Sequence, residues 1–362
     1  MSPPAVVGLR PILVTGGAGF IGSNLVDRLA REGEHVLILD DLSRAGVDRN
    51  VAWLQARHGD RVSLLVGDVR DGSTIAGVVK QASAIFHFAA QVAVTTSLRE
   101  PVEDFAINVA ATLGLLEAVR LRGGDIPVIF ASTNKVYGDL ADLPLAVRDD
   151  AYLPADDILR GRGISEQQPL DFHTPYGCSK GAAEQYVLDY ARSFGLPAAV
   201  MRMSCIYGPR QMGTEDQGWV AHFMLRILAG EPISIYGDGR QVRDVLFVDD
   251  AVEAYIRAWR AAARIAGRAF NLGGGPLNAV SLRQVLAHAE QLLGCRAELS
   301  FHPTRAGDQR YYVSDIRRVT RELALPPPLA WQAGLARLAQ WLRDEHGIRP
   351  SPATPVLQTA GA

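Results

Sequence analysis

Short apolar runs alternate with amphipathic stretches along the first half of the chain. Runs of strand length end at Thr15, Leu39, Val66, Phe88, Ala131 and Met203. Apolar positions at helical spacing fill the segments Ser23–Glu32, Gly72–Gln81, Val102–Leu121 and Cys178–Phe194. This alternation predicts an α/β fold, in which helices cover both faces of a doubly wound parallel Rossmann sheet.

Beyond about Ile206 the pattern changes to shorter, mixed segments, which predict a second, smaller α/β lobe. We expect residues 10–203 to form the first domain, with 237–268 interleaved back into it. Residues 204–236 and 269–345 are expected to form the second lobe, and 1–9 and 347–362 to be disordered. Asp139–Thr174 is a long connection with little periodicity, so it is either a binding loop or a disordered insertion.

A glycine-rich turn joins the first apolar run to the first helical segment. Gly17, Gly19 and Gly22 fit the spacing G-x-G-x-x-G, whereas Gly16, Gly19 and Gly22 fit G-x-x-G-x-x-G. Glycines let a backbone turn sharply and approach a pyrophosphate, whose charge the N-terminus of the next helix stabilises. Strand, glycine turn and helix in this order predict a dinucleotide site.

Polar residues at the strand ends are expected to line that site. Asp40 ends the second strand, where its carboxylate can accept hydrogen bonds from both ribose hydroxyls and would repel a 2′-phosphate. The sequence therefore favours NAD over NADP, a preference that nearby Arg44 weakens. Asp68 and Val69 are placed beside the adenine, although Asp68 is equally well explained as a loop cap.

Composition excludes several classes of protein. The chain has 362 residues with a net charge of -2, which gives no reason to expect nucleic acid or a membrane surface as a partner. No apolar run reaches the ~18 residues of a membrane span, and the N-terminus does not resemble a secretory signal. The three cysteines and scattered histidines indicate a reducing compartment and no metal site, so a cytoplasmic protein is expected.

Tyr176 and Lys180 are the candidate catalytic pair. Four residues apart at a helix start, their side chains share one face, roughly 5–6 Å apart at Cβ. A tyrosine titrates near ~10, and we expect the ammonium and a positively charged nicotinamide to lower that pKa. Thr133, just after the fifth strand, could bridge a substrate oxygen and Tyr176. Tyr176 would then take a hydroxyl proton while hydride leaves for NAD⁺.

Several motifs resemble those of the extended short-chain dehydrogenase/reductase family of nucleotide-sugar enzymes, over about residues 10–345. They are Thr15–Gly22, Gly67–Val69, His87–Ala90, Ser132–Gly138, Tyr176–Lys180, Tyr207–Arg210 and Gly237–Asp244. The resemblance implies Thr133, Tyr176 and Lys180 as the catalytic triad. It implies cofactor contacts at Gly16, Gly19, Phe20, Ile21, Gly22, Asp40, Asp41, Ser43, Arg44, Asp68, Val69, Ala89, Ala90, Gln91, Asn108, Tyr176 and Lys180.

Within that family the chain is most similar to CDP-tyvelose (CDP-paratose) 2-epimerases. The segments Ser132–Gly138, Pro175–Ala183, Met203–Gln211 and Gly213–Val220 carry this likeness. Family dehydratases have Asp-Glu after the catalytic threonine, whereas this chain has Asn134-Lys135, which disfavours elimination of water. Cys205 replaces a common Asn of 4-epimerases, as either an altered substrate contact or a simple buried cysteine.

The resemblance implies NAD-dependent epimerisation at C2 of a CDP-sugar, by transient oxidation and re-reduction. Expected substrate contacts are Asn134, Ser204, Cys205, Arg210, Gln217, Val220, Tyr236, Gln241, Arg243 and Arg305. The Gly237–Asp244 segment could instead be a solvated hairpin. A UDP-sugar 4-epimerase and a non-catalytic NAD sensor or scaffold remain alternatives, and family analogy suggests a homodimer.

Overall fold

A computed structural model of the chain describes residues 10–305 and 307–346, so the disorder predicted for 1–9 and 347–362 falls outside the described residues. A seven-stranded parallel sheet forms the centre of the larger domain, in the order β12-β8-β5-β4-β1-β2-β3. Its strands are β1 (Ile12–Thr15), β2 (Val36–Asp40), β3 (Val62–Val66), β4 (Ala84–His87), β5 (Val128–Thr133), β8 (Ala198–Met203) and β12 (Arg268–Leu272). The order reverses between β1 and β4, where open parallel sheets bind ligands.

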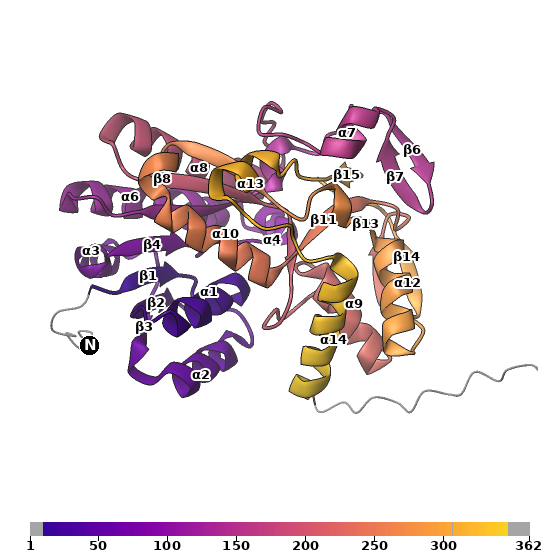
Figure 1. The fold of residues 1–362 in the computed structure, drawn as a ribbon, viewed down its shortest axis with the longest axis horizontal. Coiled ribbons are helices and arrows are strands. Elements are labelled where there is room, and N and C mark those ends of the chain that lie inside the picture. The colour runs from indigo at the N-terminus through magenta and orange to yellow at the C-terminus, as the bar shows by residue number, and fades with distance from the viewer. Residues whose placement is uncertain (1–9, 306, 347–362) are drawn as a thin grey trace, which may run out of the picture.

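Helices cover both faces of this sheet, as the apolar runs predicted (Figure 1). One face carries α1 (Phe20–Arg31), α2 (Val47–His58), α10 (Val248–Arg260), α11 (Ala262–Ile265) and α13 (Arg317–Leu323). The other face carries α3 (Gly72–Gln81), α6 (Ala111–Arg122) and α8 (Thr174–Phe194). Because both faces are buried, the central strands are apolar at successive positions.

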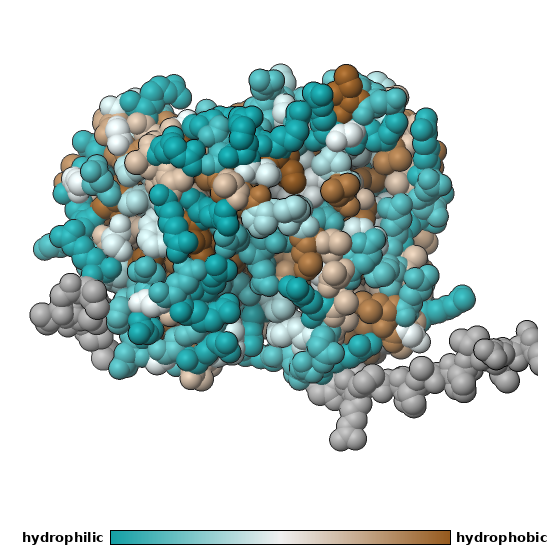
Figure 2. Space-filling view, in the orientation of Figure 1, coloured by the Kyte–Doolittle hydropathy of each residue, from teal (hydrophilic) through white to brown (hydrophobic). Residues whose placement is uncertain are grey.

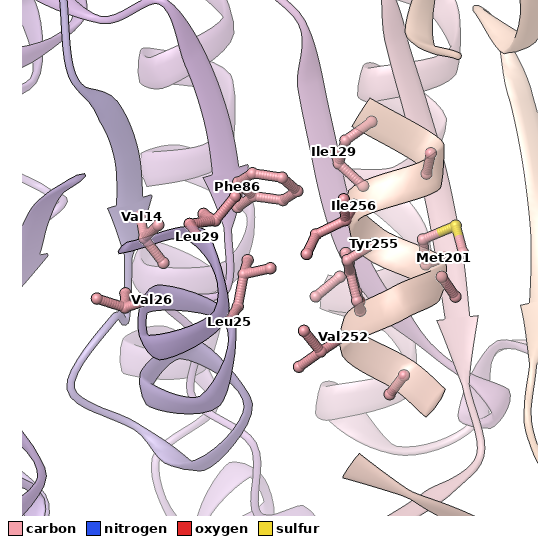
Figure 3. Packing of buried hydrophobic residues seen from close by; sticks show 14 of the residues in the cluster. Val14, Leu25, Val26, Leu29, Phe86, Ile129, Met201, Val252, Tyr255 and Ile256 are labelled. Atoms are coloured by element: carbon pink, nitrogen blue, oxygen red, sulfur yellow. The ribbon is translucent and has the colours of Figure 1, made fainter. Parts of the chain in front are cut away.

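The first face is an interdigitated apolar layer (Figure 3). Leu25 and Leu29 of α1 point toward Phe86 of the sheet, and Tyr255 of α10 packs on the same ring at a centroid distance of 6.4 Å. All four side chains are fully buried. These contacts fix α1 over β1, and so fix the turn that connects them.

A second, smaller lobe lies beside the sheet (Figure 1). Its core joins α9 (Trp219–Ala229), α12 (Leu282–Leu293) and α14 (Trp331–His346) to short strands. The core strands are β9 (Cys205–Tyr207), β10 (Ile233–Tyr236), β11 (Val242–Phe247) and β13 (Ala279–Ser281), and the lobe also contains β14 (Leu299–His302) and β15 (Tyr311–Tyr312). Strand β11 pairs with β9, β13 and β15, and β10 pairs with β14.

The division of the chain differs from the predicted one at two strands. Strand β12 was expected in the second lobe, but it pairs with β8 as the edge of the large sheet. Strand β11, expected within the first domain, pairs only with second-lobe strands. The reason is that α10 buries its apolar face on the large sheet and carries the chain back to it.

Two further segments differ from the expectation. The 139–174 connection is neither disordered nor free of structure, because it contains the hairpin β6 (Leu145–Arg148) and β7 (Ala151–Pro154) and the helix α7 (Asp157–Arg162). The single helix predicted at Val102–Leu121 is divided into α5 (Pro101–Phe105), a π-helical turn at Ala106–Ala110 and α6, preceded by α4 (Val94–Arg99). Such turns often occur at functional sites.

The outer surface is mostly hydrophilic on the face drawn in Figure 2, with apolar residues in small groups. Among the helices in the described residues, none combines the length and apolar character that crossing a membrane requires.

Replacing Leu25 with alanine should destabilise the fold by about 2–5 kcal/mol, since it removes buried methyl groups and leaves a cavity between α1 and the sheet. Urea unfolding monitored by circular dichroism measures the change. Leu277, which is 90% exposed, is the matched control, and Leu277→Ala should stay within about 0.5 kcal/mol. Equal losses in the two variants would contradict this packing.

Candidate active site

A cavity of ≈ 480 Å³ opens at the carboxyl ends of the central strands. It runs from the glycine turn after β1, past the ends of β2, β3 and β4, to residues of β5 and α8. Among the predicted residues, it brings together Gly16, Gly19, Phe20, Ile21, Gly22, Asp40, Asp41, Ser43, Arg44, Asp68, Val69, Ala89, Ala90, Gln91, Tyr176, Lys180 and Gln217. Its volume is typical of a small-molecule site.

The glycine turn is shaped for close approach of a ligand. Gly16 has φ +69°, and a Cβ there would lie 2.6 Å from the Ala89 nitrogen. A Cβ on Gly22 would lie 2.3 Å from the Gly16 carbonyl oxygen. No side chain caps α1 at Gly19, so the N-terminus of the helix is open to an anion in the cavity. These features fit a dinucleotide pyrophosphate.

The spacing of the motif can now be assigned. Gly16, Gly19 and Gly22 line the cavity, whereas Gly17 lies beneath it, with its Cβ position 3.0 Å from Ile38 side-chain atoms. The geometry therefore corresponds to the G-x-x-G-x-x-G spacing.

Asp40 closes the end of the cavity at β2. Its carboxylate accepts hydrogen bonds from the backbone N–H groups of Ala18 and Leu42, both at 3.0 Å. Burial raises the pKa of the carboxyl, and these two donors oppose that shift. Arg44 also lines the cavity, and its guanidinium donates to the side-chain oxygen of Gln217. Gln217 was predicted as a substrate contact, but the structure places it on the cofactor side.

Asp68 makes the predicted loop-cap contact, because its carboxylate accepts from the Arg70 backbone N–H at 2.8 Å, while its place beside the adenine stays a prediction. It lines the cavity beside Val69, but its carboxylate is paired with Arg70 at 2.5 Å, and this pairing lowers the Asp68 pKa. Asn108, in the π-helical turn, does not line the cavity. Its side chain bonds Gln91 O, Asp104 Oδ1 and Ser179 Oγ, so it positions the Gln91 loop against α8.

Thr133, Tyr176 and Lys180 converge where β5 meets the first turns of α8. Tyr176 and Lys180 face the cavity, and the Tyr176 backbone N–H donates to the buried Ser97 hydroxyl at 3.1 Å. The Thr133 hydroxyl accepts from the Lys135 N–H at 3.2 Å. The Lys180 ammonium lies 4.1 Å from the centroid of the Phe130 ring.

Burial dominates the ionisation of both α8 residues. It raises the pKa of Tyr176 to about 12, although hydrogen bonding to Thr133 acts in the opposite direction. It lowers the pKa of Lys180 to about 7, opposed by Glu184 and Asp104. We expected the ammonium and an oxidised nicotinamide together to lower the pKa of Tyr176; in the protein alone, desolvation dominates and the pKa is raised.

Buried acids lie around this pair. The Glu184 carboxylate, fully buried, accepts from Arg202 at 2.6 Å and from the Ser132 hydroxyl at 2.7 Å. Asp104 is 1% exposed, its pKa is raised by burial, and its Oδ2 has no hydrogen-bond partner. Both carboxylates favour the charged form of Lys180.

A group of cations lies on the second-lobe side of Thr133. Arg243 Nη2 and Lys135 Nζ lie 3.4 Å and 3.8 Å from the same Asp308 oxygen. Lys135 Nζ also donates to the Gly307 carbonyl at 2.9 Å, and burial lowers its pKa to about 8. Asn134 donates to the Gln309 side chain at 3.0 Å. Asn134 and Lys135 are the two residues directly after Thr133, so neither of these positions carries a carboxyl group.

The remaining substrate candidates lie on β9, on β10, in the segment before β11 and, for Arg305, in the connection between β14 and β15. The Cys205 thiol accepts from the Trp219 indole at 3.4 Å, and burial raises its pKa. Gln241 donates to the Tyr236 carbonyl at 2.5 Å, and its own side-chain oxygen is buried without a partner. Arg305 stacks on the Tyr236 ring, 3.6 Å from its centroid.

Three predicted substrate contacts are corrected by their placement. Arg210 stacks on Trp53, 4.0 Å from the ring centroid, and joins the two lobes outside the cavity. Val220 is 2% exposed in the core of the second lobe. The Ser204 hydroxyl donates to the fully buried Asp244 carboxylate at 2.5 Å, a structural contact.

Several residues close to the candidates were not singled out from the sequence. Lys135 directly follows the predicted Asn134, and Trp219 directly precedes the predicted Val220. In each case the sequence prediction chose the adjacent position. Glu184 lies four residues after Lys180 on α8, a helical spacing that could have indicated it. Asp104 lies on α5 and carries no local signal, because spacing does not show which acid faces a lysine of another helix. Within residues 10–305 and 307–346, no three His, Cys, Asp or Glu side chains gather as a metal-binding group.

Comparison with known proteins agrees with this arrangement. Residues 12–273 match the NAD dependent epimerase/dehydratase family. The chain is 39% identical to a CDP-paratose 2-epimerase of Salmonella typhi, across 91% of this chain and 98% of that protein. It is 35% identical to a UDP-glucose 4-epimerase of Mycolicibacterium smegmatis, across 92% and 98%. A Thermus thermophilus UDP-glucose 4-epimerase solved with NAD superposes with a TM-score of 0.78 at 31% identity, covering 92% and 99% of the two chains.

Replacing Gly22 with alanine should abolish NAD binding, because the new Cβ would meet the backbone of Gly16 and Gly17 at 2.3 and 2.7 Å. Isothermal titration of NAD-stripped protein measures the effect. Gly77 of α3 has open space at its Cβ position, so Gly77→Ala should bind NAD normally and gain about 0.5–1 kcal/mol of stability. Normal NAD affinity in the Gly22 variant would refute the assigned turn.

Proposed function

Because the chain belongs to the NAD dependent epimerase/dehydratase family, we propose that it is a nucleotide-sugar epimerase that inverts C2 of a CDP-sugar with bound NAD. The observation that carries this proposal is that Tyr176 and Lys180 line the end of the cavity and Thr133 hydrogen-bonds Tyr176, without a carboxyl group at positions 134 and 135. A site of this composition can move one proton and one hydride, but it lacks the acid that elimination of water needs.

Tyr176 is proposed as the general base and acid for the reacting hydroxyl. The raised pKa of Tyr176 keeps the phenol protonated in the empty site, so a further positive charge is needed to make it a base near neutral pH. Bound NAD supplies the hydride acceptor and donor, and its oxidised ring adds that charge. Lys180 contributes the second cation, whose charged form Glu184 and Asp104 favour.

The proposed sugar site lies beyond Thr133, toward the second lobe. A substrate diphosphate needs cations, and Arg243 and Lys135 provide two that share one carboxylate partner. We place the sugar between these cations and the Cys205–Trp219 contact. After oxidation, the 2-keto sugar would rotate about its diphosphate and present its other face to the same Tyr176.

An isotopic experiment tests the reaction type. Substrate deuterated at C2 should keep its label through epimerisation, and product formed in deuterium oxide should contain no solvent deuterium at carbon, because the hydride is returned to the carbon it left. Mass spectrometry of the product measures both. Entry of solvent deuterium would indicate deprotonation at carbon and refute the proposal.

A substrate panel run with the same assay separates the rivals. The 35% identity to a UDP-glucose 4-epimerase favours C4 of a UDP-sugar as the second candidate. CDP- and UDP-sugars that differ at C2 or C4 should show inversion only at C2 of the CDP compounds. Absence of turnover with every member would favour an NAD-binding protein without catalysis.

We also propose a homodimer, formed through exposed apolar side chains of α4, α5, α6 and α8. The side chains of Val102 and Leu121 are 80% and 72% exposed. About half of each side chain is exposed at Leu98 (50%), Phe105 (56%) and Phe194 (51%). These helices pack on one another, so the side chains belong to neighbouring elements.

Sedimentation equilibrium tests this association. The wild type should sediment as a dimer, and Val102→Asp with Phe105→Asp should yield a monomer, because charges would be buried at the interface. Leu277→Asp, at a position 90% exposed on another element, is the control and should remain dimeric. A monomeric wild type, or a dimeric double variant, would exclude this interface.

A further inference from the structure

A short hairpin between Gly213 and Gly218 projects from the second lobe. Thr214 and Gln217 exchange backbone hydrogen bonds of 2.8 and 3.2 Å, which leaves Glu215 and Asp216 at the tip. The base is fixed by its glycines: a Cβ on Gly213 would lie 2.6 Å from the His222 nitrogen, and Gly218 has φ +78°. This 213–218 hairpin belongs to none of the motifs that build the catalytic cluster.

One side of the hairpin faces the cofactor cavity. Thr214, Asp216 and Gln217 are the second-lobe residues among its lining, opposite Asp40 and Arg44 of the larger domain. The Gln217 side-chain oxygen accepts a hydrogen bond from the Arg44 guanidinium. This contact crosses from one lobe to the other at the end of the cavity that Asp40 closes.

The tip of the hairpin contacts the proposed nucleotide-sugar side. Arg305 donates to the Glu215 carboxylate at 2.9 Å and to the Glu215 carbonyl at 3.2 Å, and it lies 3.4 Å from the Asp216 carboxylate. The Tyr236 hydroxyl bonds Glu215 as well. Arg305 itself does not line the cofactor cavity.

We propose that the 213–218 hairpin retains NAD between turnovers: Gln217 and Arg44 close the Asp40 end of the cavity, and Arg305 holds the hairpin in place. An epimerase regenerates its oxidised cofactor in each cycle, so slow release serves it better than exchange. Cofactor leaving at this end must break the contact between Gln217 and Arg44. Arg305 is then a positioning residue for the cofactor, besides its place in the proposed substrate site.

The closure of the cavity by Gln217 and Arg44 depends on the NAD site alone, while the role of retention between turnovers rests on the proposed function. The support of the hairpin by Arg305 depends on the contacts at the hairpin tip. A residue outside the cavity should influence NAD release only if the hairpin transmits its contact. Loss of a hydrogen bond to a charged group changes a dissociation constant roughly tenfold, and we expect release rates to change on that scale.

Release of labelled NAD tests both parts without any sugar. Protein loaded with isotope-labelled NAD is chased with excess unlabelled NAD, and the label that remains bound is counted over time. Gln217→Ala and Arg305→Met should each release NAD roughly tenfold faster than the wild type. Gln340→Ala, an exposed glutamine on α14, is the matched control and should match the wild type. Thermal unfolding of NAD-free variants confirms that they fold.

A wild-type release rate in Gln217→Ala would overturn the closure of the cavity by Gln217 and Arg44. A wild-type rate in Arg305→Met would overturn the proposal that Arg305 holds the hairpin in place. Because no turnover is measured, failure of either variant is distinct from failure of the proposed epimerisation. Isotope retention at C2 could hold while NAD release is unchanged, or the reverse.

Discussion

Desolvation of the Tyr176 phenol is the constraint on which the chemistry depends. Inside the protein its pKa rises to about 12, because the anion loses the water that would stabilise it. The neighbouring amine is desolvated too, which lowers the pKa of Lys180 to about 7. The chain thus holds a weak acid and a weak cation together, and an added positive charge at the nicotinamide position can shift the phenol toward its anion. The Tyr176 phenol would act as a base when oxidised cofactor is bound and would stay protonated when it is not.

The rest of the fold positions this pair against the cofactor cavity. Helix α1 is fixed by its apolar contacts with the sheet, which sets the glycine turn at one end of the cavity. Helix α8 is held by the buried Glu184–Arg202 pair and by the Ser97 contact to Tyr176, which sets the other end. A buried ion pair of this kind adds little net stability but leaves few alternative arrangements for the residues it joins. The second lobe then places its cations and the 213–218 hairpin over both ends.

Most of the fold could be predicted from the sequence, since buried parallel strands and amphipathic helices leave strong periodic patterns. Residues at the end of a strand, such as Asp40 and Thr133, were predictable from the apolar run before them. Prediction failed where only packing decides: Val220 points into a core and its neighbour Trp219 toward Cys205, and Arg210 stacks between lobes. The pairing of β12 with β8 in the large sheet also depends on the path that the chain takes through α10. No local sequence pattern shows this path. The raised pKa of Tyr176 in the protein alone was not predictable, because burial cannot be read from spacing.

The most direct measurement is the pKa of Tyr176 in the presence and absence of NAD⁺. Tyrosine labelled with ¹³C at the ring carbon that bears the hydroxyl allows a titration by NMR, and the Tyr176→Phe spectrum assigns the signal. The account predicts a pKa near the upper end of the tyrosine range without cofactor and a value about 1–3 units lower with NAD⁺. The neutral ring of NADH should restore the higher value. The same pKa in the free and the NAD⁺-loaded protein would contradict the account.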